Sequence, residues 1–257
     1  MACDLLDAQR TRAIISALRP DVVIHAQALS DVDQCEVEPD AAQTLNVQTI
    51  ANVVQALAAE QALLICVSTD YVFDGKKGRP YDETDEPNPI NVYGRSKLEA
   101  ERQALGYPRA VIVRTSTLFG AGRMNFCDHI VQQLTSGQPI EAFVDQVTSP
   151  TYTVDLAEGI GDLCAVLMVS RALQPRVVHM ANAGECSRFT FAQRVRELLG
   201  CPVELVQPIP MAHQRRPAAR PRYSALTTIR VPQVIRRTLR SWDDALQAYL
   251  RARHLRN

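Results

Sequence analysis

Three kinds of side chain that can move a proton gather between residues 63 and 97. Tyr93 and Lys97 are four residues apart, so on a helix they share one face. Thr69, with Ser68 beside it, follows directly on a short apolar run. A nearby ammonium favours the phenolate form of a tyrosine, and a hydroxyl can hold a carbonyl oxygen while charge develops on it. These residue types predict proton transfer between Tyr93 and a carbonyl oxygen.

A strand and a helix must position these side chains. The run Leu63–Val67 is typical of a parallel strand buried on both faces, and Asp70 completes the polar group at its carboxyl end. In open α/β sheets, ligands bind at that end of the strands. A loop rich in Pro, Gly and Asp then leads to a helix around Tyr93 and Lys97. A Tyr-x-x-x-Lys spacing alone is more often packing plus a solvated charge, so the prediction of catalysis depends on the strand end as well.

The rest of the chain alternates between helical and strand-like patterns. This alternation predicts an α/β fold with a parallel sheet, and the length of the chain suits a smaller appended lobe. The expected helices are residues 8–18, 41–60, 153–170, 189–199 and 243–253, and the expected strands are residues 21–26, 63–67, 110–114, 140–144 and 176–180.

Charge is distributed unevenly along a chain whose formal net charge is zero. From Arg188 to Arg256 there are fourteen arginines, no lysine and only four acidic residues. Arginine matches phosphate geometry bidentately, so a nucleoside diphosphate fits this segment. Nucleic acid fits less well, because no recognised binding motif and no interleaved aromatic residues accompany the charge.

Cysteine usage and hydropathy narrow the class of protein further. The seven cysteines are scattered and form no Cys-x-x-Cys pair, which argues against a disulfide framework or a zinc site and predicts a reducing, cytoplasmic location. The most apolar window, residues 160–169, is interrupted by Asp162 and is too short to span a bilayer. The acidic run at residues 82–86 is expected to be a solvated face, and we expect no metal site.

Several motifs closely resemble the dTDP-4-dehydrorhamnose reductase family of extended short-chain dehydrogenases/reductases. They are STDYVFDG at residues 68–75, PYDETDEPNPINVYGRSKLEAE at 80–101, RTSTLFG at 114–120, DQVTSPT at 145–151 and RPRYSAL at 220–226. The resemblance covers nearly the whole chain and implies a Rossmann-like, doubly wound parallel sheet with a smaller C-terminal substrate lobe. It implies that residues 1–115 and 151–182 form the dinucleotide-binding domain, and that residues 116–150 and 183–257 form the substrate-binding lobe. It implies reduction of a nucleotide-sugar 4-ketone, dTDP-4-dehydro-L-rhamnose above all, by NADPH or NADH.

The resemblance also implies roles for individual residues. Tyr93 would protonate the sugar 4-oxygen, Lys97 would hold the nicotinamide ribose and tune Tyr93, and Thr69, with Ser68, would hydrogen-bond the reacting oxygen. The implied cofactor-binding residues are Asp4, Leu5, Ala26, Gln27, Ala28, Tyr93 and Lys97. The implied substrate-binding residues are Thr69, Asp70, Asn125, Arg220 and Arg222. On the residues alone, Asp4 could equally be a helix cap, Asn125 a turn residue and the arginines solvent-facing.

A glycine-rich G-x-x-G-x-x-G turn, which cradles a dinucleotide's pyrophosphate, is missing from the sequence. In the resembled family it lies in a segment that would precede Met1, about 35 to 40 residues long and on the scale of one strand–helix–strand unit. We therefore expect either that the true start lies upstream or that the chain is truncated and has little affinity for the cofactor.

Two other functions are compatible with the same motifs. One is a non-catalytic subunit, because the regulatory subunit of methionine adenosyltransferase resembles this family as well. The other is a related reductase or epimerase that acts on a different nucleotide sugar. For the oligomeric state, we consider a homodimer.

Overall fold

A four-stranded parallel sheet forms the centre of the computed structural model, which describes residues 2–170 and 174–254. The strands lie in the order β1 (Val22–His25), β2 (Leu63–Thr69), β3 (Ala110–Thr115) and β8 (Val177–His179). All three pairings are parallel, and Ser68 lies opposite Arg114 in the register of β2 and β3. The predicted α/β fold with a Rossmann-like parallel sheet is confirmed.

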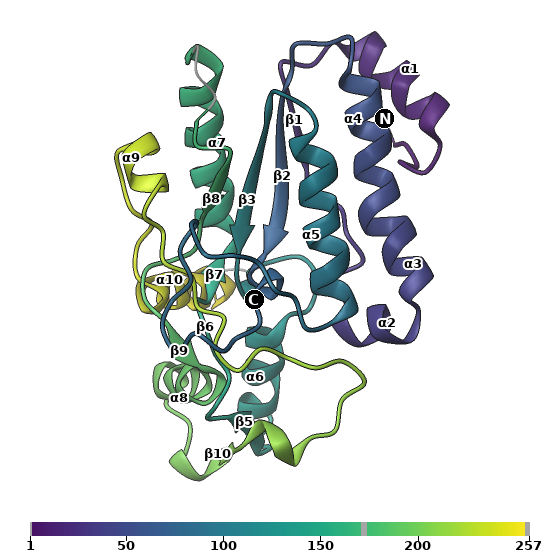
Figure 1. Ribbon diagram of the computed structural model, residues 1–257. Helices are drawn as coiled ribbons and strands as arrows, with labels where there is room; N and C mark the ends of the chain where they lie inside the picture. Colours follow the sequence, from purple (N-terminus) through teal and green to yellow (C-terminus); the bar gives the residue numbers. More distant parts are fainter. Residues whose placement is uncertain (1, 171–173, 255–257) are drawn as a thin grey trace.

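Helices cover both faces of this sheet (Figure 1). α1 (Ala8–Leu18), α4 (Thr49–Leu57) and α5 (Val92–Leu105) lie on one face, and α7 (Thr153–Val169) lies on the other. Side chains alternate along β2, so Leu64 and Cys66 pack toward α4 and α5 while Leu63 and Ile65 pack toward α7. Both faces are therefore apolar, as expected for a buried parallel strand.

A second lobe lies beyond the carboxyl ends of the strands (Figure 1). Its core joins aromatic and aliphatic side chains around Phe119, which contacts the rings of Tyr152, Phe191 and Tyr249. The elements of this lobe are β4 (Leu118–Phe119), α6 (Phe126–Thr135), β5 (Ile140–Phe143), β6 (Val147–Thr148), β7 (Thr151–Tyr152), β9 (Cys186–Ser187), α8 (Arg188–Leu199), β10 (Val206–Ile209) and α10 (Trp242–His254).

One segment near the C-terminus returns to the first lobe. α9 (Val231–Ile235) packs against α7, and its buried residues Val231 and Ile235 join Leu239 in the core on that face of the sheet. The proposed division of the chain, in which all of residues 183–257 belong to the substrate lobe, therefore needs an exception for this segment.

Several element boundaries differ from the sequence-based expectations. The predicted helix at residues 41–60 is divided into α3 (Pro39–Gln43), a π-helical turn (Thr44–Gln48) and α4, and it is preceded by α2 (Val32–Val37). The π-helical turn carries Asn46, whose buried amide group donates to Ser96 Oγ and accepts from the Leu29 amide. Short 3-10 turns occupy Asp70–Val72, Val203–Leu205 and Met211–His213.

Strand β1 is an edge strand of the sheet in the part of the chain that the structure describes. It pairs with β2 on one side only, and Ile24 on β1 is 52% exposed. Among these residues no helix is both long and apolar enough to cross a membrane.

Candidate active site

A cavity of about 410 Å³ opens at the carboxyl end of β2. Thr69 comes from the last residue of that strand, and Tyr93 and Lys97 come from the first two turns of α5. Ala26 and Ala28, which follow β1, line the same cavity. The structure thus brings the three side chains singled out in the sequence to one volume.

Close approach of α5 to the end of β2 depends on Gly94. A Cβ atom on this residue would lie 2.1 Å from the carbonyl oxygen of Tyr71, which no side chain can tolerate. Asn91 fixes the start of the helix, because its side chain accepts from the Gly94 amide at 2.7 Å and donates to the Ala219 carbonyl at 2.8 Å. The helix therefore begins against the strand end, with Tyr93 facing Thr69.

Tyr93 is held as a neutral phenol. Burial raises the pKa of Tyr93 well above its ordinary value, the negative charge of Asp70 adds to this, and a hydrogen bond with Thr69 acts in the opposite direction. The sequence argument expected an ammonium to favour the phenolate, but burial is the largest influence on the pKa of Tyr93 and keeps the phenol neutral. A protonated phenol suits the role of an acid.

Lys97 is buried beside Tyr93 and Thr69. Its Nζ donates to the carbonyl oxygen of Val67 at 2.8 Å, so the ammonium is tied to the strand two residues before Thr69. An ammonium has three donors, and the other two remain for groups in the cavity.

Ser68 and Asp70 are used differently from Thr69. Ser68 lines the same cavity as Thr69, but its hydroxyl is engaged with α5, where it donates to Glu101 Oε1 at 2.5 Å. The Asp70 carboxylate is 2% exposed and accepts hydrogen bonds from the hydroxyls of Thr69, Ser116 and Ser224. Burial raises the pKa of Asp70, and these three hydrogen bonds oppose that effect.

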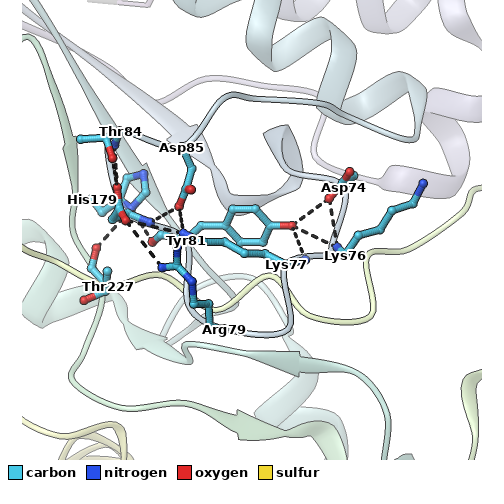
Figure 2. Close-up of polar contacts among 10 residues, drawn as sticks. Asp74, Lys76, Lys77, Arg79, Tyr81, Thr84, Asp85, His179 and Thr227 are labelled. Atoms are coloured by element: carbon cyan, nitrogen blue, oxygen red, sulfur yellow. Dashed lines mark hydrogen bonds and ion pairs between the residues drawn. The ribbon is translucent and has the colours of Figure 1, made fainter.

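The loop between β2 and α5 is folded around two stacked rings. The ring centroids of Phe73 and Tyr81 lie 4.2 Å apart. The Tyr81 hydroxyl donates to Asp74 and accepts from the amides of Lys76 and Lys77 (Figure 2). Further along, Asp85 and Asp82 both pair with Lys77. The acidic run is therefore occupied within the loop and is not simply a solvated face.

The same loop is fixed to the sheet. His179 at the end of β8 directs Nδ1 at the carbonyl oxygens of Tyr81 and Thr227, at 3.1 and 3.2 Å (Figure 2). The buried Glu83 carboxylate accepts from the amides of His179 and Arg230. Two acceptors at Nδ1 require that it carries the proton, so His179 is the Nδ1–H tautomer.

The residues expected to hold the cofactor lie on both sides of β1. Leu5 and Gln27 line an apolar cavity of about 370 Å³ beside α1, together with Val23 and His25. Asp4 is exposed and accepts from the Leu6 amide. The two ring nitrogens of His25 are buried and have no hydrogen-bond partner among the described residues, so this wall offers polar atoms to a ligand.

The expected substrate-binding residues do not all point into a cavity. Asn125 lines a separate cavity of about 420 Å³ and caps α6: its side chain accepts from the amides of Cys127 and Asp128 and donates to the Gly120 carbonyl. Arg222 is exposed and lines none of the cavities described here. Arg220 pairs bidentately with Asp33 at 2.8 Å for both contacts, and it lines a cavity of about 210 Å³.

Two further residues, Arg188 and Tyr71, lie between this smaller cavity and the larger one and line both. Arg188 packs on the Phe126 ring at 4.5 Å, and its buried Nη1 has no hydrogen-bond partner among the described residues. Burial lowers the pKa of Arg188. The Tyr71 ring meets that of Tyr93 edge-on at 5.9 Å. The sequence analysis missed Arg188 as a site residue, because it was one of fourteen arginines in the C-terminal segment. The one signal that could have selected it is its position at the start of α8.

Within residues 2–170 and 174–254, no three His, Cys, Asp or Glu side chains are placed to hold a metal ion.

Comparison with known proteins identifies the family. The sequence profile described as RmlD substrate binding domain matches residues 1–254. A dTDP-4-dehydrorhamnose reductase of Mycolicibacterium smegmatis is 38% identical over 248 residues, which are 95% of this chain and 74% of that protein. The chain belongs to the RmlD family. The recognition made from its motifs is therefore confirmed.

Solved structures of RmlD family members have the same fold as this chain. The crystal structure of dTDP-4-dehydrorhamnose reductase from Bacillus anthracis in complex with NADP has a TM-score of 0.90 at 31% identity, covering 97% of this chain and 86% of that one. A relative from Clostridium acetobutylicum also has a TM-score of 0.90 at 31% identity, covering 98% of this chain and 87% of that one. The Rossmann-like fold of this RmlD family chain is that of its solved relatives.

Proposed function

We propose that this chain reduces the 4-ketone of a nucleotide sugar with NADPH or NADH, and that its substrate is dTDP-4-dehydro-L-rhamnose, giving dTDP-L-rhamnose. One observation carries the proposal: Thr69, Tyr93 and Lys97 face one cavity at the carboxyl end of β2. Family membership supports the same reaction, because relatives at 31–38% identity bear the name dTDP-4-dehydrorhamnose reductase.

Tyr93 acts as the acid. When bound, the reduced nicotinamide supplies a hydride to the carbonyl carbon of the substrate. The phenol of Tyr93 donates its proton to the ketone oxygen as negative charge develops there. Thr69 lies beside it, and rotation of its hydroxyl hydrogen from Asp70 toward the ketone gives that oxygen a second donor.

The nicotinamide and adenosine ends of the cofactor fit the chain's own residues, whereas the glycine-rich turn that cradles a pyrophosphate is missing from the sequence. Tyr93 and Lys97, with the small side chains of Ala26 and Ala28, would hold the nicotinamide and its ribose. Leu5 and Gln27 in the apolar cavity, with Asp4 next to Leu5 in the chain, would hold the adenosine half. The unpartnered ring nitrogens of His25 support a polar ligand at this wall.

The diphosphate of the substrate suits the arginine-lined cavity. Arg188, Arg216 and Arg220 converge there, and the Nη1 atom of Arg188 lacks a protein partner in the described part of the chain. An anionic oxygen at this position would complete the hydrogen bonds of a buried guanidinium. We assign Arg222 and Asn125 no direct contact with the substrate.

Replacement of Tyr93 tests the proposal. Tyr93→Phe removes the proton donor and should lower kcat for reduction of dTDP-4-dehydro-L-rhamnose by about a hundredfold or more. The measurement is NADPH consumption at saturating sugar. Tyr107→Phe is the matched control: that phenol donates to the carbonyls of Glu60 and Ala62, far from the cavity, so its loss should leave kcat unchanged.

Two outcomes would count against the proposal. A Tyr93→Phe enzyme within a few-fold of the wild type would refute the assigned role. Failure of the wild type to reduce any nucleotide sugar, together with co-purification of a synthetase, would favour a non-catalytic subunit. A cytoplasmic location and a homodimer stay predictions, which cell fractionation and sedimentation would test.

A further inference from the structure

A buried ion pair lies directly behind Lys97. Glu101 is one helical turn further along α5, and Arg114 reaches it from β3 with Nε to Oε1 at 2.9 Å and Nη2 to Oε2 at 2.7 Å. Exposed fractions of 3% for Lys97, 2% for Glu101 and 5% for Arg114 exclude these charges from bulk water. Such a pair is not itself a source of much stability, because the cost of removing two charges from water offsets their attraction. Stability alone therefore does not account for the buried Glu101–Arg114 pair, and we look for a role in the arrangement of the site.

The pair decides where the Lys97 ammonium goes. A lysine and a glutamate four residues apart on a helix normally pair with each other. Here Ser68 and Arg114 occupy the Glu101 carboxylate with three hydrogen bonds. In the part of the chain that the structure describes, Lys97 has no carboxylate within ion-pair distance and donates to Val67 O instead. Its remaining donors are therefore left for the cavity.

The arrangement also fixes the helix against the strand end. Lys97 is tied to Val67 and Glu101 to Ser68, so consecutive residues of β2 are joined to consecutive turns of α5, and Thr69 is the next residue. Arg114 is held in turn by the Phe73 ring, whose centroid lies 5.3 Å from its guanidinium carbon. The ion pair thus connects both strands, the catalytic helix and the loop between them.

The charged and titratable groups around Lys97 come from each neighbouring element. They are His25 on β1, Cys66 on β2, Tyr93 and Glu101 on α5 and Arg114 on β3. Cys66 lies close to both Lys97 and Glu101. Burial raises the pKa of its thiol to about 11, while Lys97 lowers this pKa and Glu101 raises it. Lys97 and Glu101 therefore flank the same thiol without pairing.

We infer that Glu101, Arg114 and Ser68 form a positioning cluster that keeps the Lys97 ammonium free for cofactor and substrate and sets Thr69 against Tyr93. The inference rests on the proposed function, in which Lys97 holds the nicotinamide ribose. Ser68 is then a positioning residue and not a catalytic one, which its hydrogen bond to Glu101 supports.

Lysine-selective NMR tests the inference without turnover. The chain has three lysines, Lys76, Lys77 and Lys97, so ¹³Cε-lysine labelling gives three signals, and Lys97→Met identifies the one of interest. In Glu101→Gln the charge of Arg114 is uncompensated, so the Lys97 signal should titrate at lower pH. In Arg114→Gln the freed Glu101 should capture Lys97, so its signal should titrate at higher pH. Each shift should be about one pH unit or more.

The double variant and a remote pair separate positioning from simple structural support. Glu101→Gln/Arg114→Gln restores local neutrality and should return the Lys97 signal, and part of kcat, toward the wild type, whereas Arg114→Gln alone should lower kcat about tenfold or more. Asp155→Asn breaks another bidentate pair, with Arg240 on the far side of the sheet, and should leave the Lys97 signal unchanged.

Shifts of the two single variants in the same direction, or no shift, would overturn the inference. Should a single variant not fold by circular dichroism, Ser68→Ala, which keeps both charges, takes its place: an unchanged Lys97 signal with unchanged kcat would again overturn it. Opposite shifts in a protein that reduces no nucleotide sugar would leave the cluster standing and refute the proposed function instead.

Discussion

At the scale of single residues, a buried guanidinium nitrogen without a hydrogen-bond partner is the most direct indication of a ligand. Arg188 lines both the catalytic cavity and the arginine-lined one, and its buried Nη1 has no partner among the described residues. Arg188→Gln should raise KM for the nucleotide sugar by about tenfold or more, because a charged hydrogen bond to the diphosphate is lost. Initial rates against sugar concentration at saturating NADPH would measure this.

Arg222 is the control for that experiment. It is exposed, comes from the same basic segment and carries the same charge. Arg222→Gln should leave KM unchanged, since its guanidinium is outside the cavities. Equal increases in KM for the two variants would mean that the general charge of the lobe, and not the Arg188 position, binds the sugar nucleotide.

Side-chain direction explains which residue predictions needed the structure. The sequence placed Thr69, Tyr93 and Lys97 correctly at one cavity, because a strand end and a four-residue helical spacing constrain them strongly. It could not separate Ser68 from Thr69, although adjacent strand residues face opposite sides of a sheet. Nor could it tell that Arg220 pairs with Asp33, because those residues are 187 apart in the sequence.

At the scale of elements, the position of α5 controls the site. Gly94 lets the helix start against the Tyr71 carbonyl, where a Cβ atom would be 2.1 Å away. Gly94→Ala should push the helix from β2 and cost about 1–3 kcal/mol in the free energy of unfolding. It should also lower kcat about tenfold to a hundredfold, because Tyr93 and Thr69 separate. Urea denaturation and steady-state kinetics give the two numbers.

Gly161 in α7 provides the opposite case. A Cβ atom there meets nothing within 4 Å, and the residue lies inside a regular helix. Gly161→Ala should therefore raise the free energy of unfolding by about 0.5–1 kcal/mol and leave kcat unchanged. An equal loss of activity in both variants would show that the steric argument at Gly94 is wrong.

Elements were predicted well where periodicity was strong. The helix at residues 8–18 and the buried strand from Leu63 agree with the structure. The helix at residues 41–60 was wrong in detail, because the π-helical turn that carries Asn46 inward has no signature in apolar spacing. Residues 231–239 were expected in the substrate lobe, but pack on α7. The sequence around residues 231–239 carries no pattern that indicates packing against the first lobe.

At the scale of the whole molecule, buried hydroxyls connect the two lobes around Asp70. Ser116 follows β3, Ser224 belongs to the second lobe's long C-terminal segment, and both donate to the same carboxylate. Within the second lobe, Ser149 adds a reciprocal pair of hydrogen bonds with the Leu226 backbone. The catalytic cavity therefore lies where the lobes are joined, and the carboxyl end of β2 is shaped by both.

Two buried histidines should make the stability of the whole fold sensitive to acid. Burial lowers the pKa of His25 to about 4 and that of His179 to about 3, below the value near 6.5 that each has in an unfolded chain. The unfolded chain therefore binds protons that the folded chain does not. Stability should be complete above pH 6.5 and fall as the pH drops through the window toward 4.

Each histidine should contribute a loss of about 2 kcal/mol in the free energy of unfolding between pH 7 and pH 5. His25→Asn cannot titrate, so it should reduce that pH dependence by its share, whatever its effect on stability at pH 7. Urea denaturation at the two pH values, without cofactor, measures the difference. His213→Asn, at an exposed position, should keep the wild-type dependence. Parallel losses in His25→Asn and wild type would mean that the His25 ring is hydrated or paired in solution and already accepts a proton in the folded state.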